Sequence, residues 1–194
     1  MTFDIRSEMR SLLADAALAS DGDDRATLEK LIDQYDQPLR IAIAGMIKAG
    51  KSTLMNALVG QRIAATDAGE CTRIVTRYQR GQRYQVAAID HDGDAHDLRF
   101  DRGETLEIHL DGHSEADIEH IRVDWPSERL SGRQLIDTPG LGSISENVSQ
   151  RSIHFLTTES EFPTDAVVYL MRHRHPANLD FLEAFHGGFA ASGG

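Results

Sequence analysis

The chain has a single cysteine, Cys71, few aromatic residues (6%) and no apolar run long enough to cross a membrane. One cysteine excludes an internal disulfide and is typical of a reducing compartment. The longest apolar runs, at 41–47 and 166–171, are much shorter than the roughly 20 residues that a membrane-spanning helix needs. We therefore expect a cytoplasmic protein, in which any contact with membrane lipid depends on partners or on sequence outside this chain.

Basic residues are also in the minority. The 194 residues include 31 acidic and 20 basic side chains, which give a net charge of −11. This balance argues against a nucleic-acid partner, because broad nucleic-acid binding requires clustered Lys and Arg to neutralise phosphates. A hydrophobic content of 40% at this length is enough for one domain with its own core and an appendage.

A complete G-x-x-x-x-G-K-S loop occupies residues 45–52, between a strand pattern at 39–44 and a helix pattern at 53–59. This is the context that a phosphate-binding loop requires. Glycines let the backbone curl with its N–H groups toward a β-phosphate, Lys51 adds positive charge, and Ser52 offers its hydroxyl to Mg²⁺. The residues that we assign to nucleotide binding here are Gly45, Met46, Ile47, Lys48, Ala49, Gly50, Lys51, Ser52 and Thr53.

A second motif, Asp137-Thr138-Pro139-Gly140, directly follows the apolar Leu135-Ile136 of another predicted strand. An Asp at the carboxyl end of a strand beside the loop can hold Mg²⁺, usually through a water, and the amide of Gly140 can contact a γ-phosphate. Alone, the tetrapeptide is a common turn, but after a phosphate-binding loop it indicates a Walker B or switch II element. We therefore add Asp137 and Gly140 to the nucleotide site.

Between the two motifs, two threonines compete for the role of closing over Mg²⁺ and the γ-phosphate. Thr72 ends a polar loop, whereas Thr76 lies in an alternating run that indicates a strand, where a β-branched residue is ordinary. We favour Thr72. The predicted metal ligands are Ser52, Thr72 and Asp137.

The residues quoted next carry a resemblance to a known family. The runs Pro38–Gly45, Lys48–Leu54, Glu70–Thr76, Asp137–Gly140 and Asp165–Arg172 resemble bacterial dynamin-like GTPases, in particular the actinobacterial isoniazid-inducible Ini proteins. The resemblance covers about residues 36–186, and its most family-specific part is the E-C-T-R-I-V-T stretch. It implies an α/β P-loop domain of dynamin type with a mostly parallel sheet, GTP as substrate, GDP as product and Mg²⁺ as cofactor. It also implies a homodimer, formed through the GTPase domain or the helical arms, and a peripheral location at the inner face of the plasma membrane, which the parent protein remodels or maintains.

The sequence departs from related GTPases at the positions that handle the attacking water. Eukaryotic dynamins commonly have Gln-Ser where this chain has Ile47 and Lys48, and Ras-like proteins have Gln where this chain has Leu141. Positioning and charge stabilisation dominate phosphoryl transfer, so this loss predicts slow turnover rather than loss of binding. The residues left as catalytic candidates are Lys51, Thr72 and Lys48, together with backbone groups or a residue from a partner.

No N-K-x-D, T-K-x-D or S-R-x-D motif occurs, so nothing in the chain selects guanine over adenine. After a helix pattern at 178–185, the sequence ends in a glycine-rich stretch at 187–194. We expect an N-terminal fragment whose GTPase domain, at 38–194, is incomplete at its C-terminus, because open sheet edges and uncovered apolar surface are costly. The alternative is a short protein with a flexible glycine tail.

Two helix patterns precede the loop domain, one from Ile5 to Ala16 and one from Leu28 to Tyr35. They predict N-terminal helical arms at 1–37. As the resemblance implies, the arms pack with helices from farther along the parent protein. The alternative is a helical hairpin that lies on the nucleotide domain.

Residues 78–126 alternate as strands with a turn at 91–94, which predicts β-hairpins that extend the sheet. Several side chains there invite a metal hypothesis: His91, Asp92, Asp94, His96 and Asp97. We disfavour it, because D-G turns are ordinary hairpin chemistry and no second cluster has zinc-site spacing.

The sequence therefore predicts a dynamin-type GTPase domain that hydrolyses GTP with Mg²⁺. Two alternatives stay open. One is an Era- or Ras-like regulatory GTPase, against which the helical arms, the β insertion and E-C-T-R-I-V-T argue. The other is a non-catalytic module that works by helical association.

Overall fold

The structure is a computed structural model that describes residues 5–46, 48–63, 74–103, 105–139 and 164–171. The chain divides into two compact units, Met1–Pro38 and Leu39–Gly194. Each unit is described by itself below.

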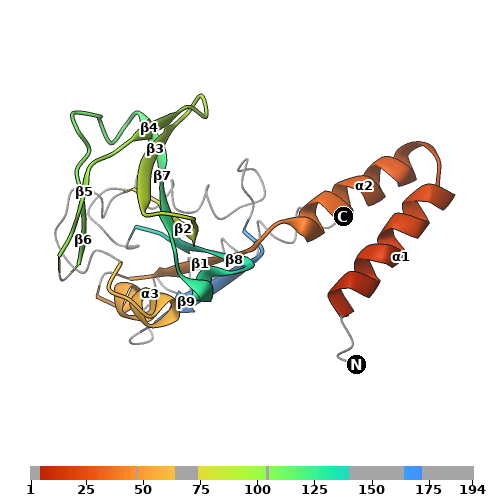
Figure 1. Cartoon of the computed structure of the whole chain (residues 1–194), viewed down its shortest axis with the longest axis horizontal. Helices are drawn as coiled ribbons and strands as arrows, with labels where there is room; N and C mark the ends of the chain where they lie inside the picture. The colour runs from red at the N-terminus through yellow and green to blue at the C-terminus, as the bar shows by residue number, and fades with distance from the viewer. Residues whose placement is uncertain (1–4, 47, 64–73, 104, 140–163, 172–194) are drawn as a thin grey trace. The chain divides into compact units, whose positions relative to one another are not determined.

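The N-terminal unit is a hairpin of two helices, α1 (Ile5–Ala19) and α2 (Gly22–Asp36) (Figure 1). Both predicted helices are confirmed. The guanidinium of Arg10 forms an ion pair with Asp36 at 2.9 Å, and the hydroxyl of Tyr35 donates to the Arg6 carbonyl at 3.2 Å. These polar contacts join the open end of the hairpin.

Little apolar surface is buried inside this helical unit. Among its described residues only Ala17 is buried, while several large apolar side chains stay exposed, including Ile5 at 69% and Leu12 at 59%. Three of them, Ile5, Met9 and Leu12, are spaced along one face of α1, as the sequence pattern predicted.

The second unit is built on a mixed sheet with the order β4-β3-β7-β2-β8-β1-β9 among the described residues. The strands are β1 (Leu39–Gly45), β2 (Thr76–Arg80), β3 (Gln85–Asp90), β4 (Ala95–Asp97), β7 (Ile118–Trp125), β8 (Arg133–Asp137) and β9 (Ala166–Leu170). β8, β1 and β9 run parallel, β2 is antiparallel to β8 and parallel to β7, and β3 is antiparallel to both of its neighbours. The predicted α/β class is confirmed, and the hairpin strands make the far side of the sheet mixed.

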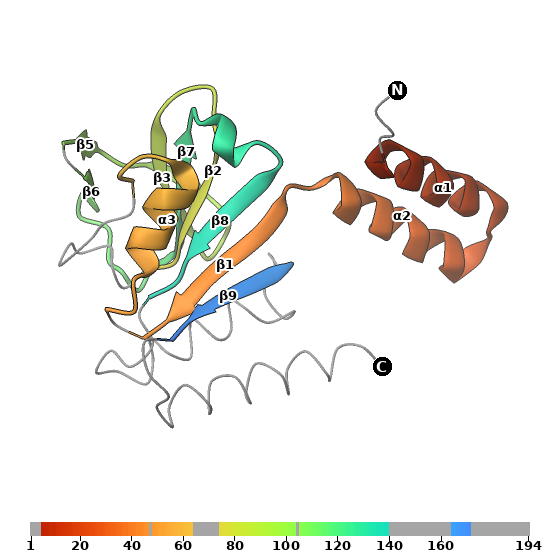
Figure 2. The ribbon, with the colours of Figure 1, turned by 90° about the horizontal axis from the view of Figure 1, so that it is seen from below.

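Helix α3 (Lys51–Val59) lies along one face of the sheet near β1 and β8 (Figure 2). Alternate residues of the strands face it, so Ile43 and Leu135 pack with Met55 in the main core. Ala42, Ala44 and Ile136 point to the opposite face and belong to a second, smaller cluster. The sheet is therefore buried on both faces around β1, which fixes the strand that leads into the loop.

The β-rich insertion (residues 78–126) contains the predicted hairpins. β3 and β4 meet at a turn containing Gly93 and extend the main sheet, whereas β5 (Phe100–Arg102) and β6 (Leu106–Ile108) form a separate two-stranded sheet. The guanidinium of Arg102 lies 3.5 Å from the centroid of the Tyr84 ring, which meets Trp125 edge to face at 4.6 Å. This aromatic contact attaches the small sheet to the main one.

The disfavoured metal site in the insertion receives no support. Where the chain is described, no group of three or more His, Cys, Asp or Glu residues is placed to hold a metal ion. His96 instead contacts the Asp90 carboxylate at 2.8 Å, and Asp90 also accepts the N–H groups of Asp92 and Asp94. The Asp side chain thus organises the turn, as hairpin chemistry predicts.

Candidate nucleotide-binding site

The predicted phosphate-binding loop connects β1, which ends at Gly45, to α3, which begins at Lys51. Gly50 precedes the helix in the left-handed conformation, with φ of +102°. The N-terminal N–H groups of α3 therefore open onto the loop, and they carry the positive end of the helix dipole. Ser52 and Thr53 lie in the first turn of α3, so every described residue of the predicted loop sits at this one edge of the sheet.

Gly45 is required by packing as well as by loop shape. It pairs with Leu170 of β9, and a Cβ built on Gly45 would lie 2.5 Å from the Leu170 carbonyl oxygen. Its φ of +148° also lies outside the range that L-residues commonly adopt. The sequence predicted that glycine is needed here for contact with a phosphate. The close approach of β9 is a second reason why this position requires glycine, and it becomes visible only from the order of the strands.

Lys51 reaches back over the loop from the first turn of α3. Its Nζ donates to the carbonyls of Gly45 at 3.1 Å and Met46 at 3.4 Å. Burial lowers the pKa of this ammonium, and the negative charge of Asp137 opposes that shift. Lys51 and Asp137, which were predicted for the site from segments far apart in the sequence, are therefore close enough for their charges to interact.

Asp137 ends β8 and stands beside Ile43 in the parallel register of β1 and β8. Its Oδ1 is buried and accepts no hydrogen bond, and desolvation raises the pKa of the carboxyl to about 6, partly offset by Lys51. A buried carboxylate oxygen without a proton donor is a suitable ligand for a hard cation such as Mg²⁺, directly or through water. The residues present at this position fit the metal that the sequence predicted.

Thr138 is a residue that the sequence reasoning missed. It is buried, and its hydroxyl donates to the Ile43 carbonyl at 3.0 Å, while its N–H reaches the same oxygen at 3.3 Å. Both bonds pin the turn after β8 to β1, and hence fix Asp137 beside the loop. A threonine in a turn commonly donates to a backbone carbonyl, so the sequence could have suggested such a bond for Thr138. It could not identify Ile43 as the acceptor, because that depends on the order of the strands in the sheet.

Lys48 is exposed and has a φ of +63°, which is uncommon for a residue other than glycine. Within the loop, the Ala49 N–H donates to the Met46 carbonyl at 3.1 Å. The remaining predicted site residues, Ile47, Thr72 and Gly140, lie outside the described residues. Thr76 begins β2 opposite Asp137, and its strand interpretation is confirmed.

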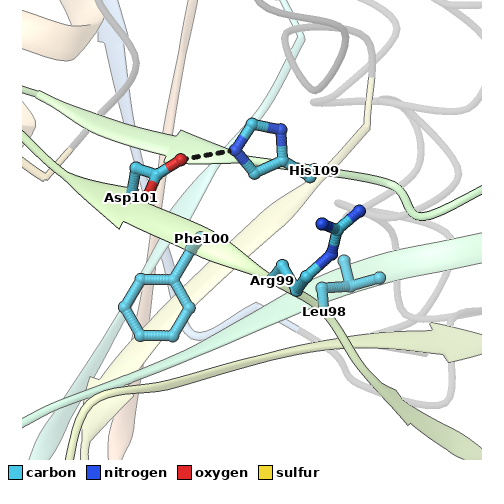
Figure 3. A pocket seen from close by; sticks show the side chains of 5 residues that line it. All are labelled: Leu98, Arg99, Phe100, Asp101 and His109. Atoms are coloured by element: carbon cyan, nitrogen blue, oxygen red, sulfur yellow. Dashed lines mark hydrogen bonds and ion pairs between the residues drawn. The ribbon is translucent and has the colours of Figure 1, made fainter.

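A separate hollow lies on the small sheet of the insertion (Figure 3). It is lined by Leu98, Arg99, Phe100, Asp101 and His109. The polar groups around it satisfy one another: His109 contacts the Asp101 carboxylate at 2.8 Å, and Arg99 forms an ion pair with Asp111. This hollow therefore has no converging set of free polar groups comparable with the loop edge.

Comparison with known proteins decides the family. Residues 41–183, which include the loop and Asp137, match the profile of the Dynamin family. The chain belongs to that family. Within it, the chain is 38% identical over 167 residues to the Isoniazid-induced protein IniC of Mycobacterium tuberculosis, covering 86% of this chain and 34% of that protein.

Other dynamins agree with this assignment. The Bacterial dynamin-like protein of Nostoc punctiforme is 25% identical over 152 residues, which cover 72% of this chain and 21% of that protein. A solved structure of an oligomerised bacterial dynamin pair superposes with a TM-score of 0.53 at 17% identity, over 96% of this chain and 30% of that one. The structural likeness shows a dynamin-type G domain fold.

This dynamin-family chain spans about a third of the length of the IniC proteins that it matches. Membership in the family supports a GTPase in general terms. Among the helices that the structure describes, none combines the length and apolar character that crossing a membrane demands.

Proposed function

We propose that this chain is the nucleotide-binding part of a dynamin-type GTPase that hydrolyses GTP to GDP and phosphate with Mg²⁺. The observation that carries the proposal is that Lys51, in the first turn of the helix that follows β1, lies at the same edge of the sheet as Asp137, which ends the adjacent parallel strand β8. Open α/β sheets bind ligands at this edge, and a cation beside a buried carboxylate suits a magnesium-bound phosphate. We assign the helical arms to residues 1–37 and the GTPase domain to 38–194.

Each site residue then has a distinct task. The loop N–H groups and Lys51 bind the phosphates, and Ser52, Thr72 and Asp137 are the residues that would hold Mg²⁺. When bound, the metal neutralises charge on the phosphate oxygens. Lys51 must leave its two carbonyl partners to reach a phosphate, which exchanges neutral acceptors for a charged one. Thr72 and the amide of Gly140 are assigned to the γ-phosphate, and Lys48 to catalysis.

The wider role is also a proposal. A solved relative is described as an oligomerised dynamin pair for sensing and tethering membranes, and by analogy we propose self-association and action at a membrane. The exposed apolar residues of α1 support association through the helical arms, while the family fold supports association through the G domain. We place the parent protein in the cytoplasm at the inner face of the plasma membrane, where lipid contact comes from other regions.

Nucleotide titration tests the proposal. Fluorescent GTP and ATP analogues, each with Mg²⁺, are titrated into the chain and into a Lys51→Ala variant, and phosphate release is followed in parallel. The matched control is Lys30→Ala, which removes one of the chain's three lysine ammonium groups from an exposed position on α2, outside the loop. We expect Lys51→Ala to lose at least about 100-fold in affinity, and Lys30→Ala to bind as the parent does.

Base preference separates the remaining possibilities. Preference for GTP shows that base selection survives without an N-K-x-D motif, whereas equal weak binding of GTP and ATP points to a base pocket completed by other sequence. Binding that does not depend on Lys51 would contradict the proposal. That result would favour a module that works through its helices, which the exposed apolar face of α1 makes a specific second candidate.

A further inference from the structure

Asp137 has a neighbouring residue on each side in the sheet. The parallel register of β1 and β8 places it beside Ile43, and the antiparallel register of β2 and β8 places it directly opposite Thr76. Directly opposed residues of an antiparallel pair present their side chains on the same face, with Cβ atoms about 4.5–5.5 Å apart. Ile43 offers the carboxylate no polar group, whereas Thr76 offers a hydroxyl.

The shared face is the one that α3 covers. Tyr78, two residues along β2 from Thr76, and Leu135, two residues before Asp137 on β8, both belong to the main core with Met55 of α3. Because side chains alternate along a strand, Thr76 and Asp137 point to the same side of the sheet as these core residues. Thr76 is only 6% exposed, so its hydroxyl lies in a buried position where an apolar side chain is more usual.

The Thr76 hydroxyl has only a long hydrogen bond. It donates to the Ile74 carbonyl at 3.4 Å, whereas O–H···O bonds are usually about 2.7–2.8 Å long. The hydroxyl of Thr138, by contrast, donates to the Ile43 carbonyl at 3.0 Å. A hydroxyl hydrogen rotates about its C–O bond, so Thr76 can turn from this weak partner to a better acceptor at little cost.

The Asp137 carboxylate is such an acceptor. Its Oδ1 is buried and accepts no hydrogen bond, and outer hydrogen bonds to a metal-binding carboxylate fix the orientation of that carboxylate. We propose that Thr76 is a positioning residue, whose hydroxyl donates to the Asp137 carboxylate when a magnesium-bound nucleotide occupies the site. This inference rests on the proposed function, in which Asp137 holds Mg²⁺. Thr76 acts through Asp137 and is not itself a ligand.

This role has a characteristic signature. Loss of an outer hydrogen bond to a metal-binding residue typically weakens metal affinity about 10- to 100-fold. Affinity for nucleotide without metal should be unchanged, because the phosphates are assigned to the loop N–H groups and Lys51. A Thr76 that only fills space in β2 would give neither effect when it is replaced by a residue of the same shape.

Two substitutions at residue 76 separate the hydroxyl from the shape of the side chain. Thr76→Val keeps the β-branch and volume and removes the hydroxyl, whereas Thr76→Ser keeps the hydroxyl. A fluorescent, non-hydrolysable GTP analogue is bound in EDTA and at increasing Mg²⁺ to give the apparent Mg²⁺ affinity. We expect this affinity to fall about 10- to 100-fold in Thr76→Val and to stay within about 3-fold in Thr76→Ser. Binding in EDTA should stay within about 3-fold in both.

Thr164→Val is the matched control. Thr164 is also 6% exposed, and it precedes Asp165, whose N–H donates to the Arg40 carbonyl near the start of β1. This is the end of β1 away from the phosphate-binding loop. We expect Thr164→Val to keep the Mg²⁺ affinity of the parent chain, and both Val variants to unfold within about 5 °C of the parent. If Thr76→Val does not fold, Thr76→Ala replaces it in the comparison with Thr76→Ser.

The outcomes separate this inference from the proposed function. If the parent chain shows Lys51-dependent, Mg²⁺-dependent binding and Thr76→Val keeps the same Mg²⁺ affinity, the inference is wrong and the proposed function stands. An equal loss in Thr76→Ser, or in Thr164→Val, would show a general effect of packing and would also overturn the inference. If nucleotide binding by the parent chain depends on neither Lys51 nor Mg²⁺, both fail together.

Discussion

The loop edge of the sheet and the exposed hairpins of the β-rich insertion differ in how their polar side chains are paired. At the loop edge, Asp137 is buried with an unsatisfied oxygen, Lys51 is desolvated, and Lys48 has a left-handed backbone. In the exposed hairpins of the insertion, polar side chains contact one another across the hairpins, such as His96 with Asp90 and Arg99 with Asp111. At the loop edge these locally unfavourable features fall on residues that the nucleotide is proposed to contact, as expected when a functional site is built on a scaffold.

The same substitution in the two regions gives the largest expected difference. Gly45→Ala brings a Cβ to 2.5 Å from the Leu170 carbonyl oxygen, so β1 or β9 must shift. Gly93→Ala, in the β3–β4 turn with φ of +87°, meets nothing within 4 Å. We expect the first change to lower the free energy of unfolding by about 3 kcal/mol or more, and the second by about 1 kcal/mol. Urea unfolding followed by circular dichroism measures both, and equal losses would contradict the comparison.

Asp137→Asn tests whether the buried carboxylate is costly to the fold. Its pKa in the folded chain, about 6, lies above the ordinary 3.8, so ionisation opposes folding. Its contribution to stability is full below about pH 4 and is lost as the pH rises through about 6. At about pH 8 we expect the Asn variant to be more stable than the parent by on the order of 1–2 kcal/mol, because the gain is partly offset by loss of the Lys51 counter-charge.

The pH dependence of that difference is the decisive measurement. The stabilisation should shrink toward zero below about pH 3, where Asp137 is protonated in both folded and unfolded chains. Mg²⁺-dependent nucleotide binding should fall in the parent as the pH drops through about 6, and should be lost in the Asn variant at every pH. An Asn variant less stable than the parent at about pH 8 would show that the carboxylate stabilises the fold instead.

The order of the motifs, and most of the fold around them, could be predicted from the sequence. The loop, the Asp137 motif and the strand starting at Thr76 depend on short patterns of apolar and turn residues. The approach of β9 to Gly45 could not be predicted, nor could the bonds of Thr138 to β1, because both depend on which strands become neighbours. The periodicity of the sequence predicts which face of the sheet a residue occupies. It does not predict which strand becomes the neighbour of that residue.

The environment of the buried His120 on the other sheet face was also not predictable. His120 on β7 is buried, and desolvation together with Arg77 and Arg122 lowers its pKa to about 3. In the sequence it is one of nine histidines, with a charged residue on one side and an apolar one on the other. Arg122 lies two residues along the same strand, but Arg77 comes from β2 through the parallel pairing of β2 with β7, which joins distant segments.

A hydrogen bond between the segment that follows α3 and the insertion gives a smaller effect. Gln61 follows α3 and accepts a bond from the indole Nε1 of Trp125 at 2.8 Å. Gln61→Leu leaves this N–H without its acceptor, so we expect a loss of about 1 kcal/mol in the free energy of unfolding. Trp125 is the only tryptophan, so its emission should shift as well. Gln82→Leu, an exposed glutamine in the insertion, is the matched control, and an equal emission change in both variants would contradict a specific contact.

The exposed pair of Asp101 and His109 should give the smallest effect. The two side chains keep 74% and 46% of their surface in solvent, so water and salt screen their 2.8 Å contact. Asp101→Asn should change the free energy of unfolding by less than about 0.5 kcal/mol, and raising the salt to about 0.5 M should abolish the difference. Urea unfolding at two salt concentrations measures this. A loss of more than about 1 kcal/mol in the free energy of unfolding that persists in salt would contradict this expectation. It would mean that the exposed contact of Asp101 with His109 stabilises the fold as a buried contact does.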